Sequence, residues 1–323
     1  MRNVRLFLGA LSILLLVSLA WIFAARAGLL TPAESTLRAR YALADSQFLT
    51  LDGEVVHYVD RGRGPALVLL HGSAGSLRMW DDWDQALTGQ FRVIRFDRPR
   101  MGLSGPAPAG MDDTERELQV IKALTRYLRA ESFFVVGTSS AGVAAAAYAA
   151  SHPTQIRGVV LSNIAVGSFK SAATQRSLAL RAMLAIDPWL GGWRPAALWQ
   201  QVLLANFHDP GKVPPGLARE WADLNNRAQR MPPATMLSSP MAKFDRTVED
   251  LPRITAPTLL LWSDHDHELP VETMGRRGFA LSGAADKQLE VVSHCGHMLP
   301  LECGVESAAI ARGFFLRIAA QNP

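Results

Sequence analysis

The 323-residue chain has only two cysteines and little net charge. Cys295 and Cys303 are too few for a disulfide framework or a tetrahedral zinc site. A bridge between them is conceivable if the protein is exported, but two half-buried free thiols are the favoured interpretation. The net charge is +4, and Lys and Arg form no long run, which argues against a nucleic-acid partner.

Internal repeats and low-complexity tracts are also absent from the sequence, which argues against a repeat protein or a disordered chain. The composition is 49% hydrophobic and 19% charged, so a sizeable core can be buried. The length suits one large α/β domain with an insertion, or two domains.

One long hydrophobic run is present, an uncharged stretch of 20 residues from Leu6 to Ala25. As a helix it would span about 30 Å, the thickness of a bilayer's hydrocarbon layer. It exceeds the apolar region of a cleavable signal peptide, and Ala25-Arg26-Ala27 is a poor cleavage site. We therefore predict an uncleaved signal anchor over residues 6–26, after a short tail of residues 1–5, rather than a signal peptide.

The flanking charges predict the orientation of this anchor. Arg2, Arg5 and the α-amino group precede it, and Arg26 ends it. The excess of positive charge at the amino side favours a cytoplasmic amino end. The prediction is a single-pass membrane protein whose main domain lies on the periplasmic or extracellular side, joined by a tether with a short helical piece over residues 27–46.

Segments of strand and helix character alternate along the rest of the chain, which predicts a parallel sheet with right-handed crossovers. The core is assigned to residues 47–165 and 251–323. Strands are expected at 48–51, 55–59, 65–70, 91–96, 133–137, 156–161, 257–262 and 288–292. Helices are expected at 80–88, 112–130, 143–150, 271–281 and 302–319.

The alternation stops over residues 166–250, where several prolines interrupt segments of helical spacing. This pattern predicts a mostly helical insertion that forms a cap. Four of the eight tryptophans lie in it, at Trp189, Trp193, Trp199 and Trp221. Most of its aromatic side chains should form a small packed core, and some could line an apolar pocket facing the sheet.

The stretch from Phe133 to Gly142 has the pattern of a nucleophile elbow, in which a strand turns sharply into a helix. Ser139 lies two residues after Gly137 at the tip of this turn and is favoured over Ser140 as the nucleophile. Its hydroxyl would lie at the helix N-terminus, where backbone N–H groups stabilise negative charge. The alternative interpretation is an ordinary Ser/Gly turn before a helix.

A serine hydroxyl needs a base, and the base needs an orienting carboxylate. Asp266 and His297 follow the strands at 257–262 and 288–292, so both should reach the same edge of the sheet as Ser139. The order Ser, Asp, His is that of the α/β-hydrolase arrangement. Asp264 and Glu268 are rival acids, and His294 is the rival base.

The loop after the 65–70 strand predicts an oxyanion site. The backbone N–H groups of Ser73 and Ser140 could hold a developing oxyanion. His71 is expected to support its own loop, and Asp97 and Arg98 to brace neighbouring loops. His265 and His267, with Asp264 and Asp266, would make a poor tetrahedral metal site, so no metal is expected.

Together these residues resemble the α/β-hydrolase superfamily over about residues 47–320, in its serine-nucleophile type with a cap. The resemblance rests on His71-Gly72 followed by Trp80, Asp97-Arg98-Pro99 with Gly102 and Ser104, the elbow Gly137 to Gly142, Trp262 through Asp266 to Pro270, and Gly296-His297. It implies an eight-stranded, mostly parallel sheet, a cap over the active site and no cofactor. Arg100, Ser263 and Ala141 depart from it, because glycine is common at those positions.

The resemblance, together with the identity of the elbow residue, narrows the reactions that this chain is expected to catalyse. Epoxide hydrolases and haloalkane dehalogenases of this family carry Asp at the elbow, so Ser139 argues against both. The leading hypothesis is a membrane-anchored serine hydrolase that acts on a small-molecule substrate, an apolar carboxylic ester, through an acyl-enzyme. Carbon–carbon bond hydrolysis, acyl transfer and haloperoxidase-like chemistry remain alternatives, as does a non-catalytic ligand-binding protein. Carbon–carbon hydrolases tend to carry a Gly-Pro-Gly type loop, which Ser73-Ala74-Gly75 lacks.

Overall fold

The computed structural model describes residues 2–51, 53–105, 112–170, 177–227 and 244–321. At its centre lies an eight-stranded sheet with the order β1-β2-β4-β3-β5-β6-β7-β8. Its strands are β1 (Gln47–Leu51), β2 (Glu54–Gly62), β3 (Ala66–Leu70), β4 (Arg92–Phe96), β5 (Phe133–Thr138), β6 (Ile156–Ser162), β7 (Thr258–Ser263) and β8 (Lys287–Val292). The expected fold class, an α/β-hydrolase sheet flanked by helices, is confirmed.

The pairing explains where the loops meet. β1 and β2 form an antiparallel hairpin, and β2 also runs antiparallel to β4. The strands from β4 through β3, β5, β6 and β7 to β8 are parallel. Strands β3 and β5 are fully buried, as a sheet covered on both faces requires. The carboxyl ends of the parallel strands therefore share one edge. Asp52, in the expected hairpin turn, lies outside the described residues.

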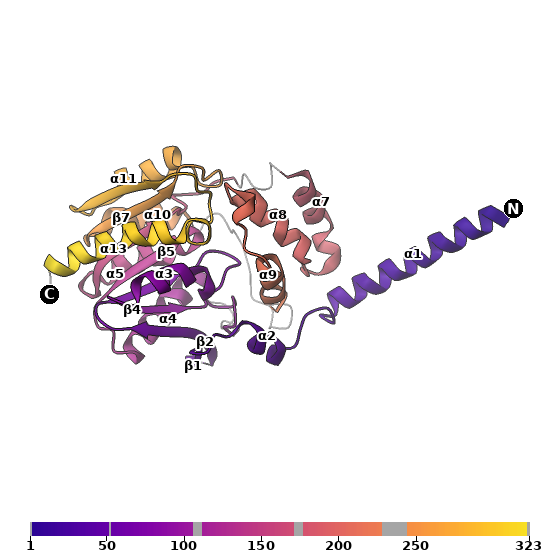
Figure 1. Ribbon diagram of the computed structural model, residues 1–323, viewed down its shortest axis with the longest axis horizontal. Helices are drawn as coiled ribbons and strands as arrows, with labels where there is room; N and C mark the ends of the chain where they lie inside the picture. The colour runs from indigo at the N-terminus through magenta and orange to yellow at the C-terminus, as the bar shows by residue number, and fades with distance from the viewer. Residues whose placement is uncertain (1, 52, 106–111, 171–176, 228–243, 322–323) are drawn as a thin grey trace.

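Helices cover both faces of the sheet (Figure 1). α3 (Asp81–Leu87) and α13 (Gly304–Gln321) pack on one face, where Trp83 and Phe315 belong to the buried cluster. α4 (Asp113–Tyr127) and α5 (Gly142–Ser151) pack on the other, around Ile121 and Tyr148. The short helices α10 (Asp245–Asp250) and α11 (Arg276–Leu281) lie on the α5 side as well, since Val248 and Phe279 contact the same cluster.

The region expected to form a cap is mostly helical where the structure describes it. It contains α7 (Leu178–Ile186), the 3-10 turn η4 (Asp187–Leu190), α8 (Ala196–Asn206) and α9 (Leu217–Asn226). Leu180, Leu203 and Trp221 form its small core, to which Met79 of the main body contributes. Residues 171–176 and 228–243 of this insertion lie outside the described residues.

The N-terminal helix α1 (Arg2–Arg26) projects away from the body, beside the cap and opposite the C-terminus (Figure 1). Of the helices that the structure describes, it alone is long and apolar enough to cross a membrane, over Leu6–Arg26. The following segment, expected as a tether with a short helical piece, does contain a helix, and this helix packs on the body. It is α2 (Glu34–Tyr41), whose Leu37 is fully buried.

Two expected helices differ in detail from the structure. The stretch 271–281 begins as a π-helical turn, Val271–Gly275, and continues as α11. The last helix is preceded by a single turn, α12 (Leu299–Glu302). This turn reverses the chain after His297, so that Cys303 returns to the loop from which the chain came.

Candidate active site

Ser139 occupies the turn between β5 and α5 in a strained backbone conformation. Its φ is +52°, which side-chain-bearing residues rarely adopt. Small residues allow the turn. A Cβ on Gly142 would collide with Ile164, while Ala141 fits fully buried without a glycine. A Cβ on Gly72 would lie 3.1 Å from that of Ser139, so the loop after β3 passes directly over the serine.

Ser139, His297 and Asp266 lie in one hydrogen-bonded series. The Oγ of Ser139 is 2.9 Å from Nε2 of His297, and Nδ1 of His297 is 2.8 Å from Oδ2 of Asp266. A carboxylate can only accept, so Nδ1 carries the proton and Nε2 of the neutral ring accepts from the serine. The structure thus brings together three side chains from three loops. Such a series can transfer the serine proton to the imidazole.

The electrostatics of His297 favour a base at this position. Burial alone would lower the pKa of this imidazole, but the charge and hydrogen bond of Asp266 outweigh it and raise the pKa above 6.5. Asp266 is itself fixed, because its Oδ1 accepts from the backbone N–H groups of Glu268 at 2.9 Å and Leu269 at 2.8 Å. The carboxylate is therefore oriented toward the ring before any substrate binds.

Asn163 is a supporting residue that sequence analysis missed. Its Nδ2 donates to Oγ of Ser263 at 2.9 Å and to the carbonyl oxygen of His297 at 3.1 Å. Its Oδ1 accepts from the N–H of Ser263 at 2.9 Å. Asn163 therefore ties the loop after β6 to those after β7 and β8. Its position directly after a central strand was the available signal.

Ser73 and Ser140, the expected oxyanion residues, lie beside each other. Ser73 Oγ donates to Ser140 Oγ at 2.8 Å, and the Arg98 guanidinium donates to the same oxygen at 2.9 Å. Arg98 also pairs with the buried Glu117 and donates to the carbonyl oxygen of His71 at 3.1 Å. These contacts hold the loop after β3 against the elbow.

His71 is a neutral structural imidazole. Burial lowers its pKa to about 4. Its Nε2 accepts from the N–H of Arg98 at 3.0 Å, and its Nδ1 donates to the Gly72 carbonyl at 2.8 Å. Asp97 accepts from the N–H groups of Leu77 at 2.6 Å and Leu103 at 2.7 Å. These residues support loops and lie outside the Ser139–His297–Asp266 series.

The structure corrects the expectation that the two cysteines are free thiols. Cys295 and Cys303 form a disulfide, with Cα atoms 6.2 Å apart, so the preference for free thiols is wrong. The turn of α12 brings Cys303 back toward Cys295, which spacing alone could not show. The bridge closes a loop that contains His297.

Glu302 joins the same loop to the cap. This buried carboxylate accepts from the N–H groups of Gly296 at 2.7 Å, His208 at 3.0 Å and Asp209 at 2.7 Å. The N–H of His297 donates to the carbonyl oxygen of Asn206, the last residue of α8, at 2.7 Å. The cap and the imidazole loop are therefore joined through the backbone, a contact that sequence analysis missed.

Two of the rival residues, Asp264 and His294, have partners outside the series. Asp264 bonds Nδ1 of His265 at 2.6 Å and the N–H of Cys295 at 3.4 Å. The ring of His294 lies near that of His265, with centroids 6.1 Å apart, and not in the series. Within the described ranges, no group of His, Cys, Asp and Glu side chains could hold a metal ion.

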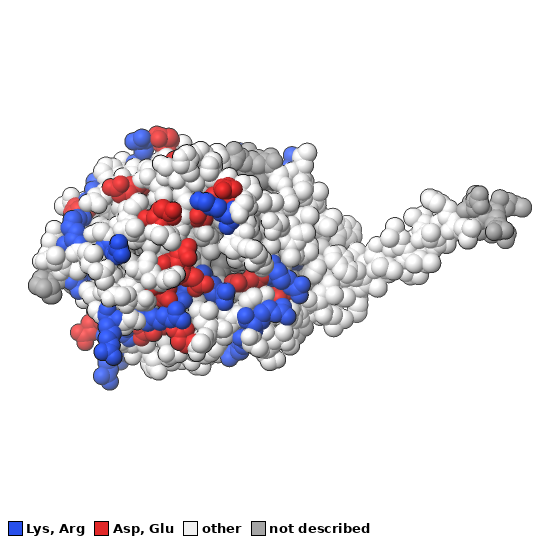
Figure 2. All heavy atoms as spheres, viewed as in Figure 1, with Lys and Arg blue, Asp and Glu red and all other residues white. Residues whose placement is uncertain are grey.

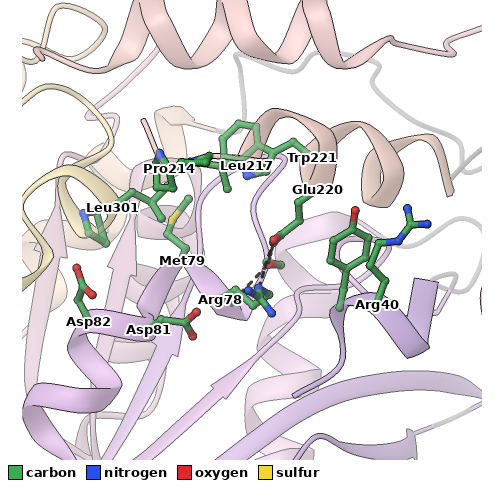
Figure 3. Close-up of a pocket in the computed structure, with 15 residues that line it drawn as sticks. Arg40, Arg78, Met79, Asp81, Asp82, Pro214, Leu217, Glu220, Trp221 and Leu301 are labelled. Carbon is green, nitrogen blue, oxygen red and sulfur yellow. Dashed lines mark hydrogen bonds and ion pairs between the residues drawn. The ribbon is translucent and has the colours of Figure 1, made fainter. Parts of the chain in front are cut away.

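A pocket of about 390 Å³ lies between α9, the start of α3 and α2 (Figure 3). A small cavity of about 10 Å³ lies at Ser139 and His297. Met79 and Pro300 line both and form the wall between them. On the other sides the pocket has apolar lining at Leu217, Trp221 and Leu301 and charged lining at Arg40, Arg78, Asp81, Asp82 and Glu220.

Arg78 and Glu220 point toward each other across this pocket, 3.3 Å apart (Figure 3). Burial raises the pKa of the Glu220 carboxyl despite the opposing effect of Arg78. The pocket therefore has apolar side chains on the α9 side, and charged side chains at the start of α3 and on α2 (Figure 3).

A family model, curated relatives and solved structures are all similar to this chain. The family model described as "Alpha/beta hydrolase family" matches residues 67–310. Pyrrolizixenacetamide deacetylase of Xenorhabdus hominickii is 28% identical over 82% of this chain and 96% of its own. The 2-hydroxy-6-oxononadienedioate/2-hydroxy-6-oxononatrienedioate hydrolase of Cupriavidus pinatubonensis is 24% identical over 82% of this chain and 93% of its own. The crystal structure of a membrane phospholipase A, a bacterial virulence factor, is similar over 99% of this chain and 100% of its own, with a TM-score of 0.64 and 24% identity.

Proposed function

This chain belongs to the alpha/beta hydrolase family, and we propose that it is a serine hydrolase, anchored in a membrane by α1, that cleaves an apolar carboxylic ester. The relatives support a hydrolase activity in general. The observation that carries the finer proposal is the hydrogen-bonded series from Ser139 through His297 to Asp266.

In the proposed reaction, Oγ of Ser139 attacks the ester carbonyl carbon while Nε2 of His297 takes its proton. The backbone N–H groups of Ser73 and Ser140 stabilise the oxyanion, and losing one such donor typically costs ~3 kcal/mol of barrier. The imidazolium, stabilised by Asp266, protonates the leaving alcohol. Water, deprotonated by His297, then attacks the acyl-enzyme and releases the acid and Ser139.

Three features support the membrane anchor and its orientation. The fold likeness to the membrane phospholipase covers nearly the whole chain and so includes α1. Arg2 and Arg5 precede the apolar run, which favours a cytoplasmic amino end. The Cys295–Cys303 disulfide fits an oxidising compartment, as expected of a domain outside the cytoplasm.

A fluorophosphonate probe, which phosphonylates an activated serine, tests the enzyme proposal directly. The wild-type protein should be labelled, and Ser139→Ala should not. Ser140→Ala is the matched control, because it removes the neighbouring hydroxyl but keeps the backbone N–H. Labelling that survives in folded Ser139→Ala would overturn the assignment of Ser139 and indicate another activated serine. A folded wild type that stays unlabelled would overturn the enzyme proposal and favour a ligand-binding protein.

The relative named for hydrolysing 2-hydroxy-6-oxononadienedioate favours a second candidate, hydrolysis of a carbon–carbon bond in such an oxo acid. Parallel assays with a panel of carboxylic esters and with a ring-fission oxo acid separate the two. We expect turnover of esters. Faster turnover of the oxo acid would reverse the order of the candidates.

A further inference from the structure

An apolar surface on the cap adjoins the membrane helix. We call it the cap face and define it by Leu178, Ile186 and Trp189 of the cap together with Leu29, which follows α1. These side chains are 79%, 49%, 68% and 67% exposed, respectively. They are not needed for packing of the cap, because α7 turns Leu180 inward and leaves Leu178 and Ile186 outside. Large apolar side chains clustered in solvent mark an interaction surface.

The cap face is fixed against the last turns of α1. Nη1 of Arg26 donates to the carbonyl oxygens of Pro188 at 3.3 Å and Trp189 at 3.4 Å. The rings of Trp21 and Trp193 meet edge to face, with centroids 5.1 Å apart. The turn η4 is thus held beside the end of the helix.

These contacts set the depth of the cap face relative to a bilayer. The candidate span Leu6–Arg26 has 21 residues, about the length that crosses the hydrocarbon layer. Trp21 lies inside this span, about 7 Å along the axis before Arg26 at 1.5 Å per residue. Since Trp193 contacts Trp21, this part of the cap reaches the level of the membrane boundary, where Trp and Arg are typical.

Charge also fits this placement. In the stretch from α7 to η4, the described charged side chains are Arg181 and Asp187. Asp187 is ion-paired with Arg194 at 3.0 Å, which leaves Arg181 as the exposed charge. In Figure 2 the cap beside α1 is almost entirely white, whereas blue and red atoms gather on the main body. An apolar face with a cation suits the interface of a bilayer with anionic lipids.

We propose that the cap face lies in the headgroup–acyl boundary of the same bilayer that α1 crosses, so that the cap is a second membrane contact. The inference rests on the proposed anchoring by α1 and deepens it. The main body, with the pocket bounded by α9 and α2, would then be held at the lipid surface. Esters that reside in the bilayer are the substrate class that this geometry favours.

Spin labels test the contact without using activity. Three single variants each carry one new cysteine for the spin label. Leu178→Cys and Ile186→Cys probe the cap face, and Leu316→Cys is the matched control. Leu316 is also exposed but lies on α13, at the end of the body opposite α1 (Figure 1). The native cysteines are bridged and do not react, and the labelled wild-type chain is the blank. The full chain is reconstituted in vesicles of phosphatidylethanolamine and phosphatidylglycerol.

We expect the labels at positions 178 and 186 to collide severalfold more often with oxygen, which concentrates in lipid, than with an aqueous nickel chelate. The label at 316 should show the reverse. Chelate accessibility at 178 and 186 equal to that at 316 would overturn the proposal. Spin–spin broadening at 178 or 186 would also overturn it, because a second copy would then cover the face. Flotation of the vesicles tests anchoring separately, since a chain that does not float has failed at α1 and not at the cap face.

Discussion

In the proposed mechanism, the proton on His297 controls whether Ser139 can react. Below its pKa the ring is protonated at Nε2 and cannot accept from the serine, so activity should rise as pH rises through that pKa. Asp266 raises the pKa of His297 against the opposing effect of burial. We expect the acid limb of kcat/KM for a soluble ester to have its midpoint above pH 6.5, the ordinary value for histidine.

Asp266→Asn should shift that limb. The substitution removes the negative charge and leaves burial, which lowers the pKa, so the midpoint should move to lower pH. It also removes the group that fixes the Nδ1–H tautomer, so kcat should fall by about 10³- to 10⁴-fold. A pH series of kcat/KM for both proteins checks this. A midpoint that does not move would mean that another group limits the wild-type reaction.

Met79 separates the cavity at Ser139 from the larger pocket and should limit the acyl chain that fits. Met79→Ala opens this wall, so the ratio of kcat/KM for a long-chain ester to that for a short-chain ester should rise. Because Met79 is buried, the variant should lose about 2 to 4 kcal/mol of unfolding free energy. The measurements are a chain-length series and a denaturant titration.

Met274→Ala is the matched control for Met79→Ala. Met274 is partly buried against the cluster on the α5 side and does not line either cavity. It should lose stability without changing the chain-length ratio. If the chain-length ratio of kcat/KM changed equally in both variants, loosening of the fold would explain the effect. That result would contradict a role for Met79 as a wall.

At the scale of elements, the His297 loop is held by the disulfide at its base. The bridge joins residues eight positions apart, and opening so short a loop costs about 2 to 3 kcal/mol in the chain-entropy relation. Reduction should lower the unfolding temperature. It should also lower kcat for a soluble ester, because His297 lies within the closed loop.

The double variant Cys295→Ala/Cys303→Ala is the control for reduction. It should resemble the reduced wild type and should not respond to reductant. Thermal unfolding and ester turnover, each with and without dithiothreitol, check both statements. A reductant that lowers the unfolding temperature of the wild type but leaves kcat unchanged would limit the bridge to a role in stability.

Local signals made the main elements predictable. Buried apolar runs indicated the parallel strands, and small residues around Ser139 indicated the turn after β5. Asp266 and His297 could be nominated because each follows the end of a strand. Residues that act through contacts distant in the sequence could not be predicted in this way. Asn163 bonds partners 100 to 134 residues away, and Glu302 bonds His208 and Asp209 across 94 and 93 residues.

Backbone reversals were also hidden from the sequence. The single turn of α12 decides that Cys295 and Cys303 meet, and no periodicity marks a helix of four residues. The departures noted in the sequence have partial explanations. Arg100 does adopt a positive φ, of 66°, where glycine is common. Ser263 bonds Asn163 through both its N–H and its hydroxyl.

In the whole molecule, α1 and the segment that follows it are tied to the cap at two places. Arg26 contacts η4, the turn after α7, and Trp21 contacts Trp193 just beyond it. Beyond them, α2 is docked on α9, where Asp223 accepts from Arg40 at 2.6 Å and from the Tyr41 hydroxyl at 2.7 Å. Glu34 pairs with Arg227 at 2.5 Å. Because the linker is bound along its length, the orientation of α1 should fix the side and the height at which the body lies.

The side of the membrane is the last prediction. A reporter that is active only outside the cytoplasm, fused after the C-terminal helix α13, should be active, and a reporter active only inside should be silent. The reason is the positive charge before Leu6, which favours a cytoplasmic amino end. As a control, moving Arg2 and Arg5 to positions after Arg26 should shift the chain toward the opposite orientation. An active cytoplasmic reporter on the unaltered chain would reverse the assignment, and the Cys295–Cys303 bridge would then have to persist against cytoplasmic reductants.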